Sequence, residues 1–136
     1  MRLRKSLGQL IEWERVCHVA TVSSRRVPHL VPVCHVVVNG KLYFASEKDA
    51  RKVRNLRTTP SIAVTVDLYS DDRSQLKGVM IQGTAKLIEK GPRFRGIRKR
   101  LYAKYPQYPQ QAALAQSESV IVEVTPTNVF SWGLEK

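Results

Sequence analysis

The stretch from Lys41 to Asp67 reads KLYFASEKDARKVRNLRTTPSIAVTVD, and it decides the fold because a strand, a basic helix and a second strand follow one another without a linker. Asn39 and Gly40, just before it, separate two apolar runs, and Asn-Gly is a strong short-range signal for a two-residue hairpin turn. At its end, SIAVTVD alternates apolar and polar residues as a half-buried strand does. The stretch therefore predicts a hairpin, a helix and a strand in succession.

The helix in this stretch is short and cationic. Ser46 and Asp49 have the S-x-x-[DE] spacing of a capping box, which predicts that the helix begins at about Glu47. Pro60 disfavours helical geometry in the residue before it, so the helix ends there. The apolar stripe is formed by Ala50, Val53 and Leu56, and the basic residues that fall mostly off it are Arg51, Lys52, Arg54 and Arg57. An anionic partner of this helix is therefore expected.

The rest of the chain is mainly β in pattern. An amphipathic helix is predicted from about Ser6 to Glu14, with an apolar stripe of Leu3, Leu7, Leu10, Ile11 and Trp13. Further strands are predicted in HVATVS, in VPHLVPVCHVVV, in VMIQGTAKLIEK, in SVIVEVTP and, as a short last strand, in NVFSWGL. Pro28 and Pro32 lack the N–H that a sheet ladder needs, which predicts an irregular or edge-exposed strand there.

Two polar features between the strands have structural interpretations. Gly83 is expected at a β-bulge or a close backbone approach. Asp71 and Asp72 are adjacent carboxylates that could serve acid–base chemistry, but their serine and arginine neighbours favour a solvated loop.

A second basic helix is predicted from about Pro92 to Tyr105. The segment from Lys86 to Lys104 has eight basic side chains and a single acid, Glu89. Such a run is either a solvated helix face or an electrostatic rim that attracts an acidic ligand.

Composition restricts the class of protein but says little about the reaction that the protein carries out. At 136 residues the chain is expected to form one domain, residues 1–136, with its own core. The formal net charge of +12 predicts an anionic partner, and a cofactor phosphate, RNA and a membrane all remain open on charge alone. The amino-terminal segment has neither a signal-peptide core nor a membrane span, so the cytoplasm is the expected compartment.

Cysteines and histidines give no metal-site pattern. Cys17 and Cys34 lie in apolar runs without a C-x-x-C pair, so they are expected as small core residues rather than a disulfide or metal site. His18, His29 and His35 are candidates for catalysis or metal ligation, but no partner stands at a ligand-like spacing, which favours hydrogen-bonded structural roles.

The order of elements predicts the fold class. Strands without a βαβ rhythm favour an antiparallel, mainly β (β+α) barrel or rolled sheet capped by two or three helices. A doubly wound nucleotide-binding fold is not expected, since no G-x-G-x-x-G or Walker pattern is present.

At this point the chain resembles the flavin-binding split-barrel family typified by pyridoxamine 5'-phosphate oxidase, and in particular its small members that use FMN or a deazaflavin coenzyme. The resemblance runs from HVATVSSRRVPHLVPV to the closing VFSWGL, and ASEKDARKVRNLRTTPSIAVTVD is its most specific part. It implies a split β-barrel and, as a rule for such proteins, a homodimer with cofactor sites at the interface.

The resemblance also implies a cofactor site. Arg51 and Lys52 match the Arg-Lys pair that grips the cofactor phosphate, and Ser46 matches a polar group near the phosphate or ribityl chain. The strand His29–Cys34, with Val31, Pro32 and Val33, matches the strand whose backbone lies along the isoalloxazine ring. Trp132 or the basic helix is expected near the cofactor of the partner subunit.

The implied activity is hydride or electron transfer by FMN, or by the deazaflavin coenzyme F-420, whose acidic tail would suit Arg93–Lys104. The cofactor would do the chemistry, so no protein residue is expected as an acid, base or nucleophile. Gly78 stands where the oxidase has a glutamine that helps hold the flavin, and no substrate-binding Arg and His follow Trp132. Vitamin B6 oxidation is therefore not expected, and no small-molecule substrate is identified.

Three alternatives stay open. A nucleic-acid-binding barrel would suit the positive charge and the three tyrosines near the basic helix, Tyr102, Tyr105 and Tyr108. A nucleic-acid partner is nevertheless the less favoured interpretation. A flavin-storage or sensing protein without turnover would bind the cofactor but not react. Heme or another tetrapyrrole could occupy the same site.

Overall fold

The structure, a computed structural model, describes residues 5–134 and contains one seven-stranded antiparallel sheet. The strand order is β2-β1-β5-β6-β7-β4-β3. The strands are β1 (Cys17–Val22), β2 (Pro28–Val33), β3 (His35–Val38), β4 (Lys41–Glu47), β5 (Ser61–Leu68), β6 (Lys77–Ile88) and β7 (Ser119–Trp132). The helices are α1 (Lys5–Trp13), α2 (Arg51–Thr58), a 3-10 turn η1 (Arg73–Gln75), α3 (Gly91–Lys104) and α4 (Tyr108–Gln111).

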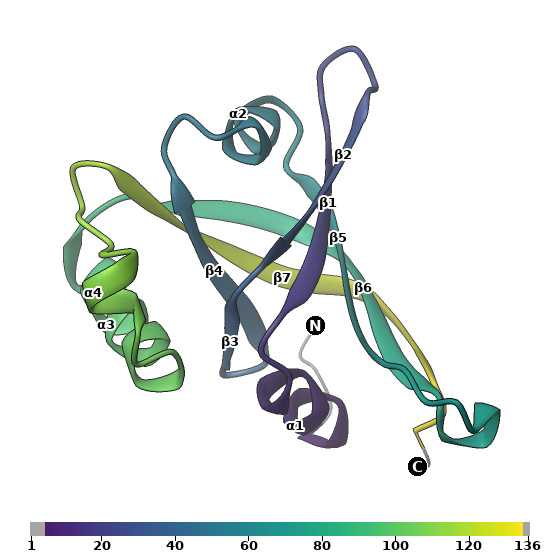
Figure 1. Cartoon of the computed structure of the whole chain (residues 1–136). Helices are drawn as coiled ribbons and strands as arrows, with labels where there is room; N and C mark the ends of the chain where they lie inside the picture. Colours follow the sequence, from purple (N-terminus) through teal and green to yellow (C-terminus); the bar gives the residue numbers. More distant parts are fainter. Residues whose placement is uncertain (1–4, 135–136) are drawn as a thin grey trace.

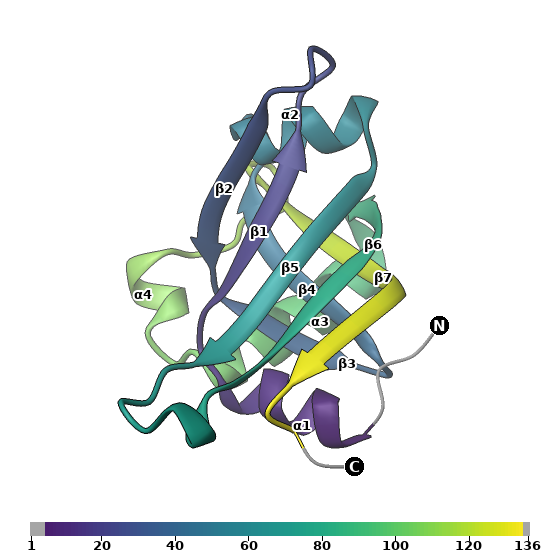
Figure 2. The ribbon, with the colours of Figure 1, turned by 90° about the vertical axis from the view of Figure 1, so that its right-hand side faces the viewer.

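The sheet curls into a half-barrel. β2 and β3 lie at opposite ends of the strand order, yet a single residue, Cys34, separates them in the chain. Because consecutive Cα atoms are only about 3.8 Å apart, the two ends of the sheet must approach each other at this point. Figures 1 and 2 show the resulting curvature, which confirms the predicted mainly β split barrel.

Several local predictions are confirmed. Asn39 and Gly40 both have positive φ, +52° and +75°, as the two central residues of a type I′ hairpin turn require. β2, which contains Pro28 and Pro32, is an edge strand of the sheet. The β6–β7 register shifts between Gln82 and Gly83, so the predicted bulge is present.

The predicted start of the first basic helix is wrong. Ser46 is a strand residue paired with Val120 of β7, and its hydroxyl donates to the Glu47 carbonyl at 3.1 Å instead of capping a helix. α2 begins only at Arg51, after a turn, and its N-cap residue Ala50 makes no side-chain hydrogen bond. The pairing of β4 with β7 extends through Glu47, and this long-range ladder prevails over the local capping pattern.

Two predicted strand boundaries also change. SVIVEVTP and NVFSWGL form one strand, β7, because β6 pairs with it along its length and the bulge places Gly83 opposite Pro126. Conversely, VPHLVPVCHVVV divides at Cys34 into β2 and β3.

The sheet separates two apolar clusters. The first cluster fills the inside of the barrel, and Leu7 and Ile11 of α1 close one end of it. Trp13 is 81% exposed, so it does not belong to the apolar stripe predicted for this helix. Leu3, also predicted for that stripe, lies outside the described residues. The second lies between α3 and the outer face of β3, β4 and β7, where Phe94, Ile97 and Leu101 are buried. β4 and the first part of β7, residues 119–124, are therefore buried on both faces, which explains the apolar runs in these segments.

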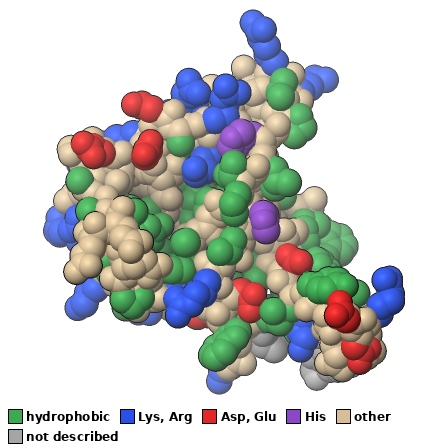
Figure 3. Space-filling model, in the orientation of Figure 1, with side chains coloured by type: hydrophobic (Ala, Val, Ile, Leu, Met, Phe, Trp, Pro, Cys, Tyr) green, Lys and Arg blue, Asp and Glu red, His purple; other side chains and the backbone are tan. Residues whose placement is uncertain are grey.

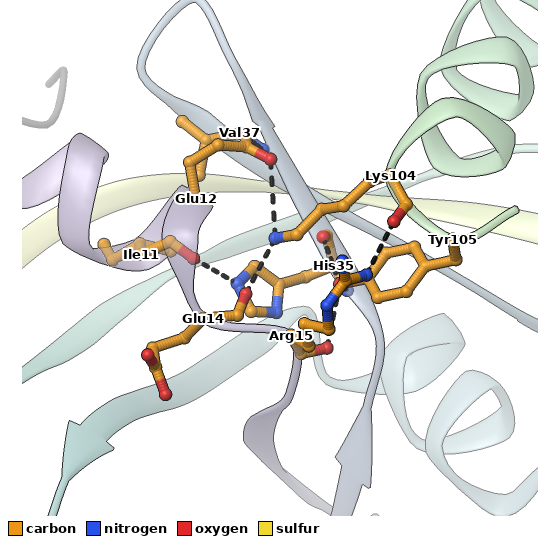
Figure 4. A network of polar contacts seen from close by, with 8 residues as sticks. All are labelled: Ile11, Glu12, Glu14, Arg15, His35, Val37, Lys104 and Tyr105. Carbon is orange, nitrogen blue, oxygen red and sulfur yellow. Dashed lines mark hydrogen bonds and ion pairs between the residues drawn. The ribbon is translucent and has the colours of Figure 1, made fainter.

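A polar network fastens α1 to β3 and to the end of α3 (Figure 4). His35 is fully buried; its Nε2 donates to the Ile11 carbonyl at 2.6 Å, and its backbone N–H donates to the Tyr105 hydroxyl at 2.8 Å. Glu12 accepts from the Val37 N–H at 2.7 Å and lies 3.4 Å from Lys104. Burial, together with the charge of Lys104, lowers the pKa of His35 to about 4. His35 therefore has the structural role that its strand position predicted.

Candidate cofactor site

α2 crosses one end of the sheet, opposite α1 (Figure 1). Val53 and Leu56 are buried beneath it, and Asn55 donates from Nδ2 to the Thr21 hydroxyl of β1 at 3.0 Å. The chain leaves α2 directly into β5. The helix is thus fixed over the strand ends by two apolar side chains and one buried hydrogen bond.

The cations at the start of α2 lack acidic partners. Arg51 is exposed and Lys52 is half-buried, and neither forms an ion pair with any acid in residues 5–134. Burial lowers the pKa of Lys52, and the charge of Glu47 offsets part of that effect. By contrast, Arg57 at the other end of α2 pairs with Glu89 at 3.1 Å. A partly desolvated cation without a partner is an electrostatically favourable place for an anion.

Ser46 lies just before the turn that leads into α2. It is 9% exposed and lines a cavity of about 590 Å³ between the end of β4 and the segment that follows α4, together with Tyr108 and Leu114. The same cavity is lined by Glu47, Asp49 and Glu118 as well as Lys48, so its walls have mixed charge. Ser46 is therefore near α2 in the chain but faces a less cationic environment than Lys52.

β2 presents its two faces differently. Val31 and Val33 pack against the barrel core, whereas Pro32 is exposed on the outer face. One backbone edge of β2 pairs with β1, and among the described strands the other edge has no neighbour. A ligand could therefore contact this free backbone edge, as the prediction for Val31, Pro32 and Val33 requires.

Trp132 lies far from this site within one chain. It pairs with Gly78, whereas Ser119, at the other end of β7, pairs with Glu47. Twelve strand residues lie between Ser119 and Trp132, and the thirteen steps from one to the other correspond to about 40 Å along the strand. The ring of Trp132 lies on Gly78, where an added Cβ would be 2.3 Å from it. Packing against the Trp132 ring is therefore enough to explain a glycine at position 78.

The basic helix α3 is partly occupied with internal contacts. Arg93 forms an ion pair with the buried Glu123, which also accepts from the Tyr43 hydroxyl at 2.9 Å. Burial alone would raise the pKa of Glu123, but the bonds from Tyr43 and Arg93 prevail and lower it. Arg98 donates to the Leu114 carbonyl at 3.1 Å. The exposed cations left for an outside partner are Arg95, Lys99 and Arg100.

The tyrosines near α3 face inward. Tyr105 is 1% exposed, the Tyr102 hydroxyl accepts from the Leu114 N–H at 2.9 Å, and Tyr108 packs edge-on to Tyr105 with ring centroids 5.7 Å apart. They are therefore not arranged as a stacking surface for bases, which removes the aromatic argument for a nucleic-acid-binding barrel.

Residues missed by the sequence analysis are polar side chains buried inside apolar patterns. Asn55 interrupts the inner side of α2, and Glu123 interrupts VIVEV in β7. A polar residue in such a position is the available signal, but its partner comes from a distant element and is not identifiable from spacing alone.

Between Lys5 and Leu134 no cluster of three or more His, Cys, Asp or Glu side chains could hold a metal ion. In the same range no helix has the length and apolar character needed to cross a membrane.

A family model described as pyridoxamine 5'-phosphate oxidase matches residues 3–133. The chain belongs to this family. A comparison with curated proteins finds no match. The family assignment confirms the resemblance noted from the sequence.

Solved structures with the split-barrel fold bind different ligands. A conserved hypothetical protein of Mycobacterium tuberculosis is similar with a TM-score of 0.80 and 19% identity over 97% of this chain and 89% of that one. HutZ, the heme storage protein of Vibrio cholerae, has a TM-score of 0.80 and 15% identity over 96% and 94%. An FAD-binding protein of Mesorhizobium loti has a TM-score of 0.75 and 18% identity over 90% and 87%. At these identities the likeness shows the fold alone.

Proposed function

We propose that this member of the pyridoxamine 5'-phosphate oxidase family is a flavin-dependent oxidoreductase that binds FMN with its phosphate at the start of α2. One observation carries the proposal most: Lys52 is a half-buried cation with no acidic partner in the described chain. Arg51 precedes it on an exposed position of the same helix turn. A phosphate dianion would supply the missing negative charge.

The cationic residues at the start of α2 match a phosphate group in charge and also in the binding free energy that they can supply. A charge-assisted hydrogen bond contributes about 1.5–3 kcal/mol, so two or three cationic donors could supply much of the free energy of micromolar binding. Ser46 and the free backbone edge of β2, at Val31, Pro32 and Val33, are proposed to bind the remainder of the cofactor. FMN supplies the hydride or electron chemistry, and these residues bind it, orient it and limit its access to water.

The deazaflavin coenzyme F-420 is the closest variant of this proposal. Its acidic tail would suit a cationic surface, and Arg95, Lys99 and Arg100 are exposed on α3. Both cofactors have a phosphate, so the α2 site serves either one, and the tail is the distinguishing group.

Heme binding is a second candidate function. The solved structures with this fold include the heme storage protein HutZ, and His18 presents an exposed side chain on the outer face of β1. An exposed imidazole on a sheet surface is a possible axial ligand for heme iron.

A homodimer is proposed from the outer face of the sheet. Figure 2 shows β2, β1, β5, β6 and β7 side by side with no helix over them. Leu30, Phe130 and Trp132 are 66%, 54% and 44% exposed on this side. Large exposed apolar residues on an uncovered sheet are typical of an interface. Trp132 would then contribute to the cofactor site of the partner subunit.

The absorption spectrum of the purified protein after reconstitution tests the proposal. FMN gives a two-banded yellow spectrum, the deazaflavin a single band and heme an intense Soret band. Saturable binding of FMN or of the deazaflavin is the expected result, and failure to bind either would overturn the proposal. Anaerobic mixing with pyridine nucleotides or a substrate panel then tests turnover, because a storage protein would bind the cofactor without being reduced.

A further inference from the structure

We propose that His29 belongs to the phosphate site, where its imidazole donates a hydrogen bond to the cofactor phosphate beside Lys52. The inference rests on the proposed function, because it needs a phosphate-bearing cofactor at the α2 end of the sheet. It is supported by the strand register, the crossing of α2 and the unsatisfied ring of His29.

The register places His29 on the side of the sheet that α2 covers. His29 of β2 pairs with Thr21 of β1, and side chains of directly opposed residues in an antiparallel pair lie on the same face. Thr21 is 4% exposed and accepts the hydrogen bond from Asn55 of α2. The side chain of His29 therefore lies next to the contact that fixes α2 to the sheet.

The crossing direction of α2 brings its N-terminal end over β2. The strand order is β2-β1-β5, Asn55 contacts β1, and the C-terminal end of α2 leads into β5. The N-terminal turn must then extend past β1 toward β2, as Figure 2 shows. One helical turn rises about 5.4 Å, close to the roughly 4.8 Å between neighbouring strands. We therefore infer that Lys52, three residues before Asn55, lies on the β2 side of α2, near His29.

The imidazole of His29 has no partner in the described chain. Its Nδ1 is buried from solvent without a hydrogen bond, and no hydrogen bond involves its Nε2. The tautomer that leaves Nδ1 without a proton has its N–H on Nε2, and that N–H is a hydrogen-bond donor. Figure 3 shows histidine, Lys and Arg side chains close together at the α2 end of the molecule. An imidazole N–H beside a half-buried ammonium group matches the oxygens of a phosphate.

The test compares two cofactors that differ only in the phosphate. Binding of FMN and of riboflavin is titrated for the wild type, for His29→Leu and for His29→Gln, which keeps an N–H donor. We expect His29→Leu to weaken FMN binding about tenfold, the effect of losing one such bond, and to leave riboflavin binding unchanged. His29→Gln is expected to recover part of the FMN affinity.

The outcomes separate this inference from the proposed function. Equal weakening of FMN and riboflavin in His29→Leu would mean that the residue only supports the fold, and no weakening of either would mean that it does not touch the phosphate. Either result overturns the inference while the proposed function stands. If the wild type binds neither FMN nor the deazaflavin, the proposed function and the inference fail together.

Discussion

Three buried polar side chains join the helices to the barrel. His35 binds α1 through the Ile11 carbonyl, Asn55 binds α2 to Thr21, and Glu123 binds Arg93 of α3. A buried polar group that loses its partner costs about 1–3 kcal/mol, so each of these bonds specifies where its helix packs. The helices that surround the candidate site are therefore positioned by single residues as well as by apolar contact.

His35 predicts a pH dependence of stability. Its pKa is about 4 in the folded protein and 6.5 in the unfolded reference, so the unfolded state binds this proton first. As the pH falls from about 6.5 to about 4, stability is lost by roughly 3 kcal/mol, and above pH 6.5 the effect is absent. Urea unfolding of the wild type and of His35→Gln across this range measures the difference, because the variant lacks the titrating ring.

An NMR titration of the His35 ring gives the same answer if the variant does not fold. A ring that titrates close to 6.5 in the native protein would contradict this account, since it would mean that burial does not disfavour the charged form.

Among the elements, β6 and β7 show how closely backbone segments pack beside the bulge. A Cβ on Gly83 would lie 2.5 Å from the carbonyl oxygen of Thr125, whereas a Cβ on Gly96, in α3, would meet no atom within 4 Å. The two glycines therefore have different reasons to be present: Gly83 permits the approach of two strands, and Gly96 occupies an open helix position.

These glycines give a matched pair of substitutions. We expect Gly83→Ala to destabilise the protein by about 1–3 kcal/mol, because backbone must move to admit the methyl group. Gly96→Ala is expected to stabilise it by about 0.5–1 kcal/mol through reduced entropy of the unfolded chain and better helix propensity. Thermal or urea unfolding measures both, and a neutral Gly83→Ala would argue against the close approach.

The attachment of α2 gives a second test at this scale. Asn55→Leu and Thr21→Val should each cost about 1–3 kcal/mol, since each leaves one buried polar group unsatisfied. The double variant should cost less than the sum, because both polar groups are then gone. Strictly additive losses in urea unfolding would show that the two side chains do not interact.

Local signals predicted those parts of the fold that depend on a few neighbouring residues. Asn39-Gly40 forms the hairpin turn, Gly83 marks the bulge, and Pro28 lies on an edge strand. The start of α2 was not predictable in this way, since Ser46 is held in β4 by its pairing with β7. The inferred placement of Lys52 near His29 likewise depends on the β1–β2 register and on the path of α2, both of which are properties of the assembled sheet.

At the scale of the whole molecule, α3 covers one part of the outer face of the half-barrel and leaves another part uncovered. The covered part, over β3, β4 and the start of β7, buries the second apolar cluster, and the uncovered part exposes Leu30, Phe130 and Trp132. Trp132 lies at the opposite end of β7 from the strand residues near α2, so one chain alone does not bring all the predicted site residues together. A second copy of the chain, packed on the uncovered part of the sheet, would bring its own Trp132 toward the strand residues near α2 of the first copy.

The proposed dimer is tested by placing a charge on that face. Sedimentation or light scattering should give a dimer for the wild type and a monomer for Phe130→Asp, because a buried, unpaired carboxylate is costly in an interface. Lys99→Asp, on the exposed side of α3, is the matched control and should remain dimeric. A monomeric wild type, or a dimer that survives Phe130→Asp, would contradict the proposed interface.

The central claim, that the start of α2 holds a cofactor phosphate, is tested most directly by the dissociation constant of FMN for the wild type, Lys52→Gln and Arg57→Gln. Both substitutions remove one positive charge from the same helix, but Arg57 already pairs with Glu89. We predict that Lys52→Gln weakens binding about tenfold to a hundredfold and that Arg57→Gln changes it by less than about twofold. Equal effects of the two substitutions, or unchanged affinity in Lys52→Gln, would contradict it.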